Sequence, residues 1–64
     1  MKASELRELT DQELREKENN LAEELFALRL QQVTGQLERF GVVKQTKKDL
    51  ARVLTVLRER QNQQ

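Results

Sequence analysis

The sequence predicts an all-α fold: an antiparallel two-helix hairpin, coiled-coil-like, with a short N-terminal helical turn. Three observations indicate this. The chain has 64 residues and no Pro, its two glycines (Gly35 and Gly41) lie near the middle, and leucines recur at helical spacing on both sides of them. A chain of this length forms one small domain. We therefore expect a single helical-hairpin domain over residues 1–64.

The first long helix is expected over residues 11–34. Thr10 and Glu13 have the spacing of a capping box, in which the Thr10 hydroxyl accepts from the Glu13 N–H and the Glu13 carboxylate accepts from the Thr10 N–H. Gly35 suits the positive φ that often follows a helix end. This helix should therefore start and stop at well-marked positions.

The second helix is expected over residues 40–60, after a turn at 35–39 and before a polar, disordered tail at 61–64. Its start is poorly marked, because the Arg39 side chain cannot accept hydrogen bonds from the free N–H groups of the first turn.

Apolar residues at heptad spacing predict that the two helices pack along one seam each, at the shallow angle of a coiled coil. The expected seam residues are Leu14, Leu21, Leu25 and Leu28 on the first helix, and Val43, Leu50, Leu54 and Leu57, with Val53 at the edge, on the second.

A second apolar strip is expected on the first helix, and a two-helix hairpin cannot cover it together with the seam. Its residues are Ala22, Phe26, Leu30 and Val33. Two alternatives are open: the strip packs against the short N-terminal turn, or it contacts RNA or a neighbouring protein.

The composition argues against catalysis. The chain contains no Cys and no His, which excludes disulfides, thiolate or imidazole metal sites, Cys nucleophiles and His acid–base chemistry. The carboxylates are spread along helix faces that offer no pocket to shift their pKa values. We expect no enzyme, no cofactor, no metal and no small-molecule substrate. No apolar run is long enough to span a membrane, and we expect a cytoplasmic protein.

The charge is divided unevenly along the chain. Residues 1–31 carry a net charge of −3, whereas residues 32–64 carry +4. Lys44, Lys48 and Arg52 follow one another at intervals of four on the second helix, flanked by Lys47 and Arg58. A row of this kind can follow a phosphate backbone. The alternative is a helix face that carries charge for solubility.

Three further polar residues lie near the turn. The Arg29 stem either rests on apolar surface with its guanidinium at the edge, or its planar fork binds phosphate. Gln31 and Gln36 are neutral hydrogen-bonding groups that fit either alternative.

Two segments resemble a known family. Phe26-x-Leu28-Arg29-x-Gln31-x-x-x-Gly35-Gln36-Leu37, followed by Lys44-x-x-Lys47-Lys48-Asp49-Leu50-Ala51-Arg52-Val53, is similar to the bacterial large-subunit ribosomal protein family numbered twenty-nine. The resemblance covers essentially the whole chain. Where many members have Asn-Pro or a similar cap, this chain has Arg39-Phe40-Gly41.

The resemblance implies a helical hairpin without catalytic activity that supports translation. It would bind large-subunit ribosomal RNA near the peptide exit tunnel, beside another ribosomal protein, where chaperones and targeting factors dock. The RNA-facing positions implied for this chain are Arg29, Gln31, Gln36, Lys44, Lys47, Lys48 and Arg52. The alternative function is a protein–protein interaction module that self-associates through the second apolar strip.

Overall fold

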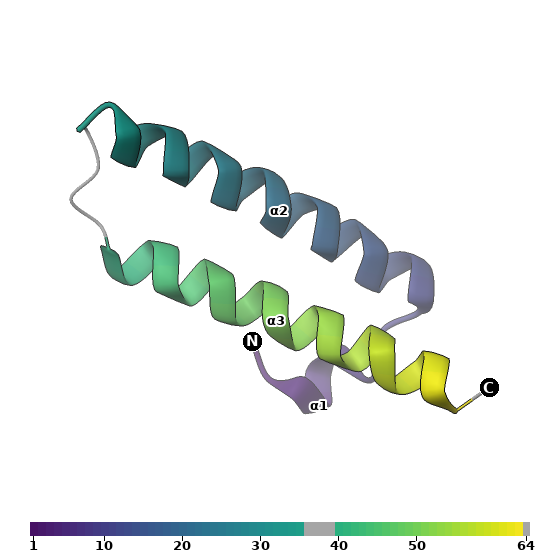
Figure 1. The fold of residues 1–64 in the computed structure, drawn as a ribbon. Helices are drawn as coiled ribbons and strands as arrows, with labels where there is room; N and C mark the ends of the chain where they lie inside the picture. Colours follow the sequence, from purple (N-terminus) through teal and green to yellow (C-terminus); the bar gives the residue numbers. More distant parts are fainter. Residues whose placement is uncertain (36–39, 64) are drawn as a thin grey trace.

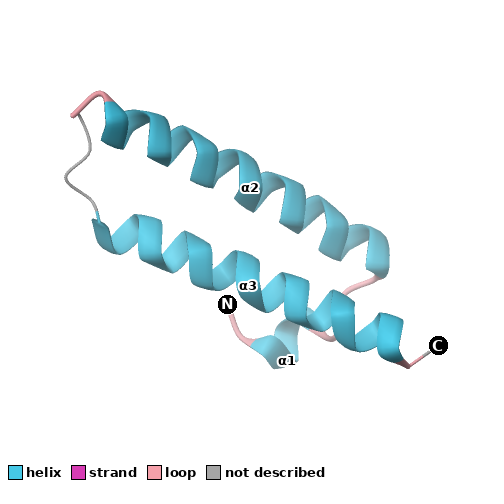
Figure 2. Cartoon of the chain, viewed as in Figure 1, coloured by secondary structure: helices cyan, strands magenta, loops and turns pink. Residues whose placement is uncertain are grey.

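The computed structural model of the protein describes residues 1–35 and 40–63. These residues form three helices: α1 (Ala3–Leu6), α2 (Asp11–Val33) and α3 (Phe40–Asn62). Figure 1 shows α2 and α3 side by side and antiparallel, with α1 lying against α3. The described residues contain helices and loops and no strand (Figure 2). The predicted fold class is confirmed.

The start of α2 has the predicted capping box. The Thr10 hydroxyl accepts from the Glu13 backbone N–H at 3.1 Å, and the Thr10 backbone N–H donates to Glu13 Oε1 at 3.1 Å. The bond from the Thr10 backbone N–H stabilises the ionised carboxylate. The pKa of Glu13 is therefore lowered, mainly by the Thr10 backbone N–H and then by its side chain.

The end of α2 lies within one residue of the predicted position, whereas α3 extends beyond its predicted end. Gly35 has φ 76°, in the left-handed region expected there, directly after the α2 C-cap. Residues 36–39 of the expected turn lie outside the described residues. The α3 helix continues to Asn62, so the expectation of a disordered tail is wrong for residues 61 and 62. Gln61 is a good helix former, so the helix can continue past Arg60.

The core lies at one end of the hairpin, where α1 meets α2 and α3. Leu6, Leu14, Val53 and Val56 are each at most 1% exposed. Three half-buried residues, Leu9, Leu21 and Leu57, pack around these four side chains. Full burial of an aliphatic side chain of this size contributes about 1.5–3 kcal/mol, so this cluster contributes much of the stability of the small fold.

The α3 seam differs from the predicted one at Leu54, which is 42% exposed. Val53 is fully buried in its place, and Thr46 is buried between Val43 and Leu50, its hydroxyl donating to the Val42 carbonyl at 2.9 Å. The seam therefore alternates steps of three and four residues, as in a coiled coil. After Leu50, the next buried residue is Val53, three positions on, rather than the predicted Leu54, four positions on.

The second apolar strip on α2 stays exposed. Because α1 packs on α3, it does not cover this strip, and the first of the two alternatives is wrong. Phe26 is 65%, Leu30 52% and Val33 85% exposed.

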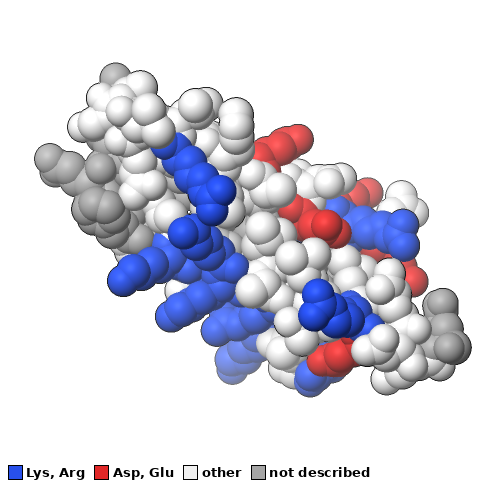
Figure 3. Space-filling model, in the orientation of Figure 1, with Lys and Arg blue, Asp and Glu red and all other residues white. Residues whose placement is uncertain are grey.

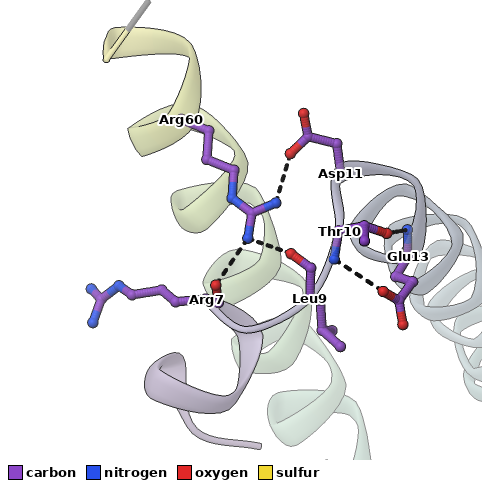
Figure 4. Close-up of polar contacts among 6 residues, drawn as sticks. All are labelled: Arg7, Leu9, Thr10, Asp11, Glu13 and Arg60. Carbon is purple, nitrogen blue, oxygen red and sulfur yellow. Dashed lines mark hydrogen bonds and ion pairs between the residues drawn. The ribbon is translucent and has the colours of Figure 1, made fainter.

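Ion pairs and hydrogen bonds fix α1 and the following loop to the last turns of α3 (Figure 4). The Arg60 guanidinium donates to Asp11 Oδ1 at 2.6 Å, to the Arg7 carbonyl at 3.1 Å and to the Leu9 carbonyl. The Arg7 guanidinium donates through Nε and Nη2 to the two carboxylate oxygens of Glu59, at 3.3 and 3.2 Å. This hydrogen-bonded pair raises the pKa of Arg7.

Candidate nucleic-acid interface

A basic stripe runs along the side of α3 that faces away from the seam. At 100° per residue, Lys44 and Lys48 lie opposite the buried side chains of Thr46 and Val53. Figure 3 shows Lys and Arg side chains gathered over α3 and projecting away from α2, whereas the acidic side chains gather mainly over α2. The α3 seam thus fixes the direction in which the stripe points. We use the name basic stripe for Lys44, Lys47, Lys48 and Arg52.

The three lysines of the stripe are accessible. Lys44, Lys47 and Lys48 are all exposed, and none of them forms an ion pair with another described residue. Their charges are therefore available to a polyanion. Thr55, farther along the same face, is not equally available, because its hydroxyl donates to the Ala51 carbonyl at 2.8 Å.

Arg52 differs from the three lysines. Its Nη1 donates to the Met1 carbonyl at 2.9 Å and lies 3.5 Å from Asp49 Oδ1. Asp49 Oδ1 also accepts from Gln45 Nε2 at 3.0 Å. The Arg52 side chain is still 44% exposed. It therefore belongs to the stripe and at the same time contacts the N-terminal segment, which the sequence pattern did not reveal.

The other predicted RNA-facing residues lie on α2 or in the turn. Arg29 and Gln31 are on the last turns of α2 with exposed side chains. The Gln31 backbone carbonyl accepts from the Thr34 hydroxyl at 2.9 Å, a bond that does not use the exposed Gln31 side chain. Gln36 lies outside the described residues.

Sequence reasoning missed the role of Arg60. Its position gives the signal: Arg60 follows Val53 by seven residues and Val56 by four, which places it at the edge of the buried face of α3. A charged side chain at such a position needs hydrogen-bond acceptors, and the Leu9 and Arg7 carbonyls supply them. Arg60 is therefore a structural residue and not part of the stripe.

Residues 1–35 and 40–63 contain neither a metal-binding cluster nor a membrane-spanning helix. No group of three or more Asp or Glu side chains is placed to hold a metal ion. None of the helices in this part of the chain is both long and apolar enough to cross a membrane.

The fold and its surface define a class: small all-α proteins in which a helical hairpin presents a basic face suited to a polyanion. Comparison with known proteins identifies the family within this class. The family model of the ribosomal L29 protein matches residues 4–60. The chain belongs to the ribosomal L29 protein family.

Several relatives named large ribosomal subunit protein uL29 are similar to it over most of their length. The Petrotoga mobilis protein is 52% identical over 95% of this chain and 92% of its own. The Natranaerobius thermophilus protein is 56% identical over 95% of this chain and 94% of its own. The Streptomyces griseus protein is 57% identical over 94% of this chain and 81% of its own.

Family membership confirms the resemblance found in the sequence. The chain is a structural ribosomal protein and not an enzyme. The predicted location, the large subunit of the cytoplasmic ribosome, agrees with this family.

Proposed function

We propose that this protein binds large-subunit ribosomal RNA through the basic stripe of α3, near the exit of the peptide tunnel. The observation that supports RNA binding is the exposure of Lys44 and Lys48 on the face of α3 opposite its buried seam, with the exposed Lys47 flanking them. Each lysine that neutralises a phosphate releases condensed counterions, which favours binding without base recognition. The position at the tunnel exit is supported by the family resemblance.

The stripe suits recognition by shape and charge. From Lys44 to Arg52 it extends about 12 Å along the helix axis, at ~1.5 Å per residue. A rigid helix can place charges at fixed intervals along folded RNA and contact phosphates and 2′-hydroxyls rather than bases. Because the described hairpin measures 44 × 17 × 16 Å, one long side can contact RNA while another stays free.

Residues near the turn extend the proposed interface. Arg29 and Gln31 are exposed on the last turns of α2. Figure 1 shows that the end of α2 lies near the start of α3. An arginine fork suits phosphate, and a glutamine amide can hydrogen-bond to ribose or phosphate oxygens. Gln36 is included on the family resemblance alone.

Salt dependence tests RNA binding. The affinity of the protein for large-subunit ribosomal RNA is measured over a series of salt concentrations. Contact with several phosphates predicts a steep negative slope of log K against log salt, with each neutralised phosphate contributing roughly 0.7–0.9. Replacement of Lys44, Lys48 and Arg52 together by Gln should weaken binding and flatten this slope.

The control is Arg15→Gln, which removes one exposed positive charge from α2 outside the stripe. This change should leave the affinity and the slope nearly unchanged. A flat slope for the natural protein, or an equal loss in the control and in the stripe variants, would contradict RNA binding by the stripe.

The exposed apolar strip on α2 supports a protein contact as well. We propose that Phe26, Leu30 and Val33 contact a neighbouring ribosomal protein, because so large an exposed apolar surface is costly in a small protein unless a partner covers it. Docking of chaperones or targeting factors nearby is implied by the family resemblance and is part of the same proposal.

The alternative for this strip is self-association of the hairpin. Phe26→Ser distinguishes the two, because Phe26 is 65% exposed and its loss should not disturb the core. Sedimentation of the natural protein as a dimer, and of the variant as a monomer, would favour self-association. A monomer in both cases, together with weaker assembly of the variant into the large subunit, would favour the neighbouring protein.

A further inference from the structure

We propose that Asp49 and the Met1 carbonyl are positioning groups for Arg52, and that they hold its guanidinium so that one edge is presented to an RNA phosphate. This inference rests on the proposed function, since it concerns how the basic stripe binds RNA. It assigns different roles to the arginine and the lysines of the stripe. It also gives a function to Asp49, an acidic residue beside a surface that binds a polyanion.

The contacts of Arg52 all involve one of its nitrogens. Nη1 donates to the Met1 carbonyl at 2.9 Å, and the same atom lies 3.5 Å from Asp49 Oδ1. Because a guanidinium is planar and its donors form a rigid fork, fixing Nη1 from two directions restricts the plane of the whole group. The Nε and Nη2 donors then lie on an edge of a side chain that is 44% exposed.

Asp49 is itself held in place. Its Oδ1 accepts from Gln45 Nε2 at 3.0 Å, one turn earlier in α3, and its side chain is only 18% exposed. Asp49 therefore accepts a hydrogen bond from the residue one turn before it and forms an ion pair with Arg52 after it. A carboxylate fixed in this way can orient a neighbouring arginine much as outer-shell carboxylates orient the ligands of a metal.

The repulsion between Asp49 and a phosphate has to be smaller than the gain from orientation. On the helical wheel, Asp49 lies nearer the buried face than Arg52, whereas Lys44 and Lys48 lie on the opposite side of Arg52. A phosphate over the stripe therefore meets the guanidinium before the carboxylate. Asp49 is also paired with Arg52, which reduces the field it exerts on RNA.

The lysines bind by a different mode. Lys44, Lys47 and Lys48 carry exposed ammonium groups on flexible stems, which act as point charges toward phosphate. They supply attraction over a range of positions. Arg52, in contrast, has lost part of its rotamer freedom before RNA arrives and offers a two-point hydrogen-bonding edge. We infer that Arg52 sets the register of the protein on RNA.

The test is a double-mutant cycle on the full chain, with affinity for large-subunit ribosomal RNA and its salt slope as readouts. Arg52→Lys keeps the charge and removes the fork, so it should weaken binding about tenfold and leave the slope unchanged. Asp49→Asn should weaken binding several-fold, although it removes a negative charge. The double variant should bind no more weakly than Arg52→Lys, because Asp49 acts through Arg52.

Two further variants complete the design. Asp49→Glu keeps a carboxylate and should recover most of the affinity lost in Asp49→Asn. Lys48→Arg, the matched control for an arginine–lysine exchange in the same stripe, should change affinity by less than about threefold. Circular dichroism of every variant checks that the helical content is unchanged.

The outcomes separate this inference from the proposed function. A flat salt slope for the natural protein would overturn RNA binding by the stripe, and this inference with it. A steep slope with Arg52→Lys binding as tightly as the natural protein would overturn this inference alone. Tighter binding by Asp49→Asn would do the same, because Asp49 would then only repel RNA.

Discussion

Near α1, the side chains of Leu14, Val53 and Val56 are at most 1% exposed, whereas near the turn Phe26 is 65% and Val33 85% exposed. The same two helices thus pack very differently at their two ends. The end near α1 has a third element, α1 itself, and two arginines that fix it to α3. The turn end has Leu25, Val43 and the polar Thr46 in its seam.

This difference separates stability from binding. The buried cluster and the hydrogen bonds of Arg60 lie at the α1 end. The lysines of the basic stripe and the exposed apolar strip lie mainly toward the turn. A domain of this size buries only about 60% of the surface that its unfolded chain exposes. In this protein, the end that stays more exposed carries the groups available to partners.

The largest expected effect comes from truncating the core at the α1 end. Leu14→Ala should lower the free energy of unfolding by about 2–4 kcal/mol, because it removes a fully buried side chain and leaves a cavity. Leu25→Ala, nearer the turn, should cost about half as much. Urea unfolding measures both values. Leu54→Ala is the control at an exposed site. If Leu14→Ala and Leu25→Ala lowered the free energy of unfolding equally, the two ends of the hairpin would not differ in packing as described.

A smaller effect is expected from Arg60→Gln. The change removes charge-assisted bonds to Asp11 and to two loop carbonyls, and should cost about 1 kcal/mol, since the Asp11 carboxylate is 59% exposed. Amide exchange of Arg7 and Leu9, which donate to Ala3 and Leu6 in α1, should become faster. Arg58→Gln, two residues away and exposed, should leave this exchange unchanged.

The two glycines on either side of the turn should respond in opposite directions to substitution by Ala. Gly35→Ala should destabilise by roughly 1–2 kcal/mol, because φ 76° is strained for a residue with a Cβ. Gly41→Ala should stabilise by about 0.5 kcal/mol, since Gly41 is in α3 and an added Cβ meets no atom within 4 Å. Thermal unfolding of the two variants compares them directly, and a shared sign would contradict this account of the turn.

The smallest expected effect is a pH dependence at the start of α2. The pKa of Glu13 is lowered in the folded chain by its bonds with Thr10. The stabilisation it provides is therefore present above the usual Glu pKa and is lost as the pH falls through the lowered folded value. Glu13→Gln should be less stable than the natural protein at neutral pH, and the difference should shrink in acid. If the difference in stability between the natural protein and Glu13→Gln grew as the pH fell, it would contradict a lowered pKa of Glu13 in the folded chain.

The sequence predicted the local features of the hairpin well. The capping box depends on Thr10 and Glu13 three residues apart, and the helix end depends on a glycine that can adopt positive φ. Both are decided by neighbours in the chain. The exposure of Lys44 and Lys48 followed from their spacing relative to the apolar residues of the same helix.

Contacts between distant parts of the chain were harder to predict. The choice between Val53 and Leu54 in the seam depends on where α1 packs, because α1 covers the flank of α3 that carries Val53 and Val56. Helical spacing alone placed Leu54 in the seam and Val53 at its edge. The contact of Arg52 with the Met1 carbonyl spans 51 positions and leaves no periodic signal in the sequence.

The hydrogen bonds of Arg60 to residues near the N-terminus affect when the fold can be completed during synthesis. Its bonds to Asp11 and to the Arg7 carbonyl join positions 49 and 53 apart. A nascent chain emerges from its N-terminus. Arg7 and Asp11 therefore leave the ribosome long before Arg60, whose guanidinium donates to them, has been synthesised. Long-range closure of this kind slows folding. We therefore expect the most stable end of the molecule to form last, as a post-translational event, although half of it is synthesised first.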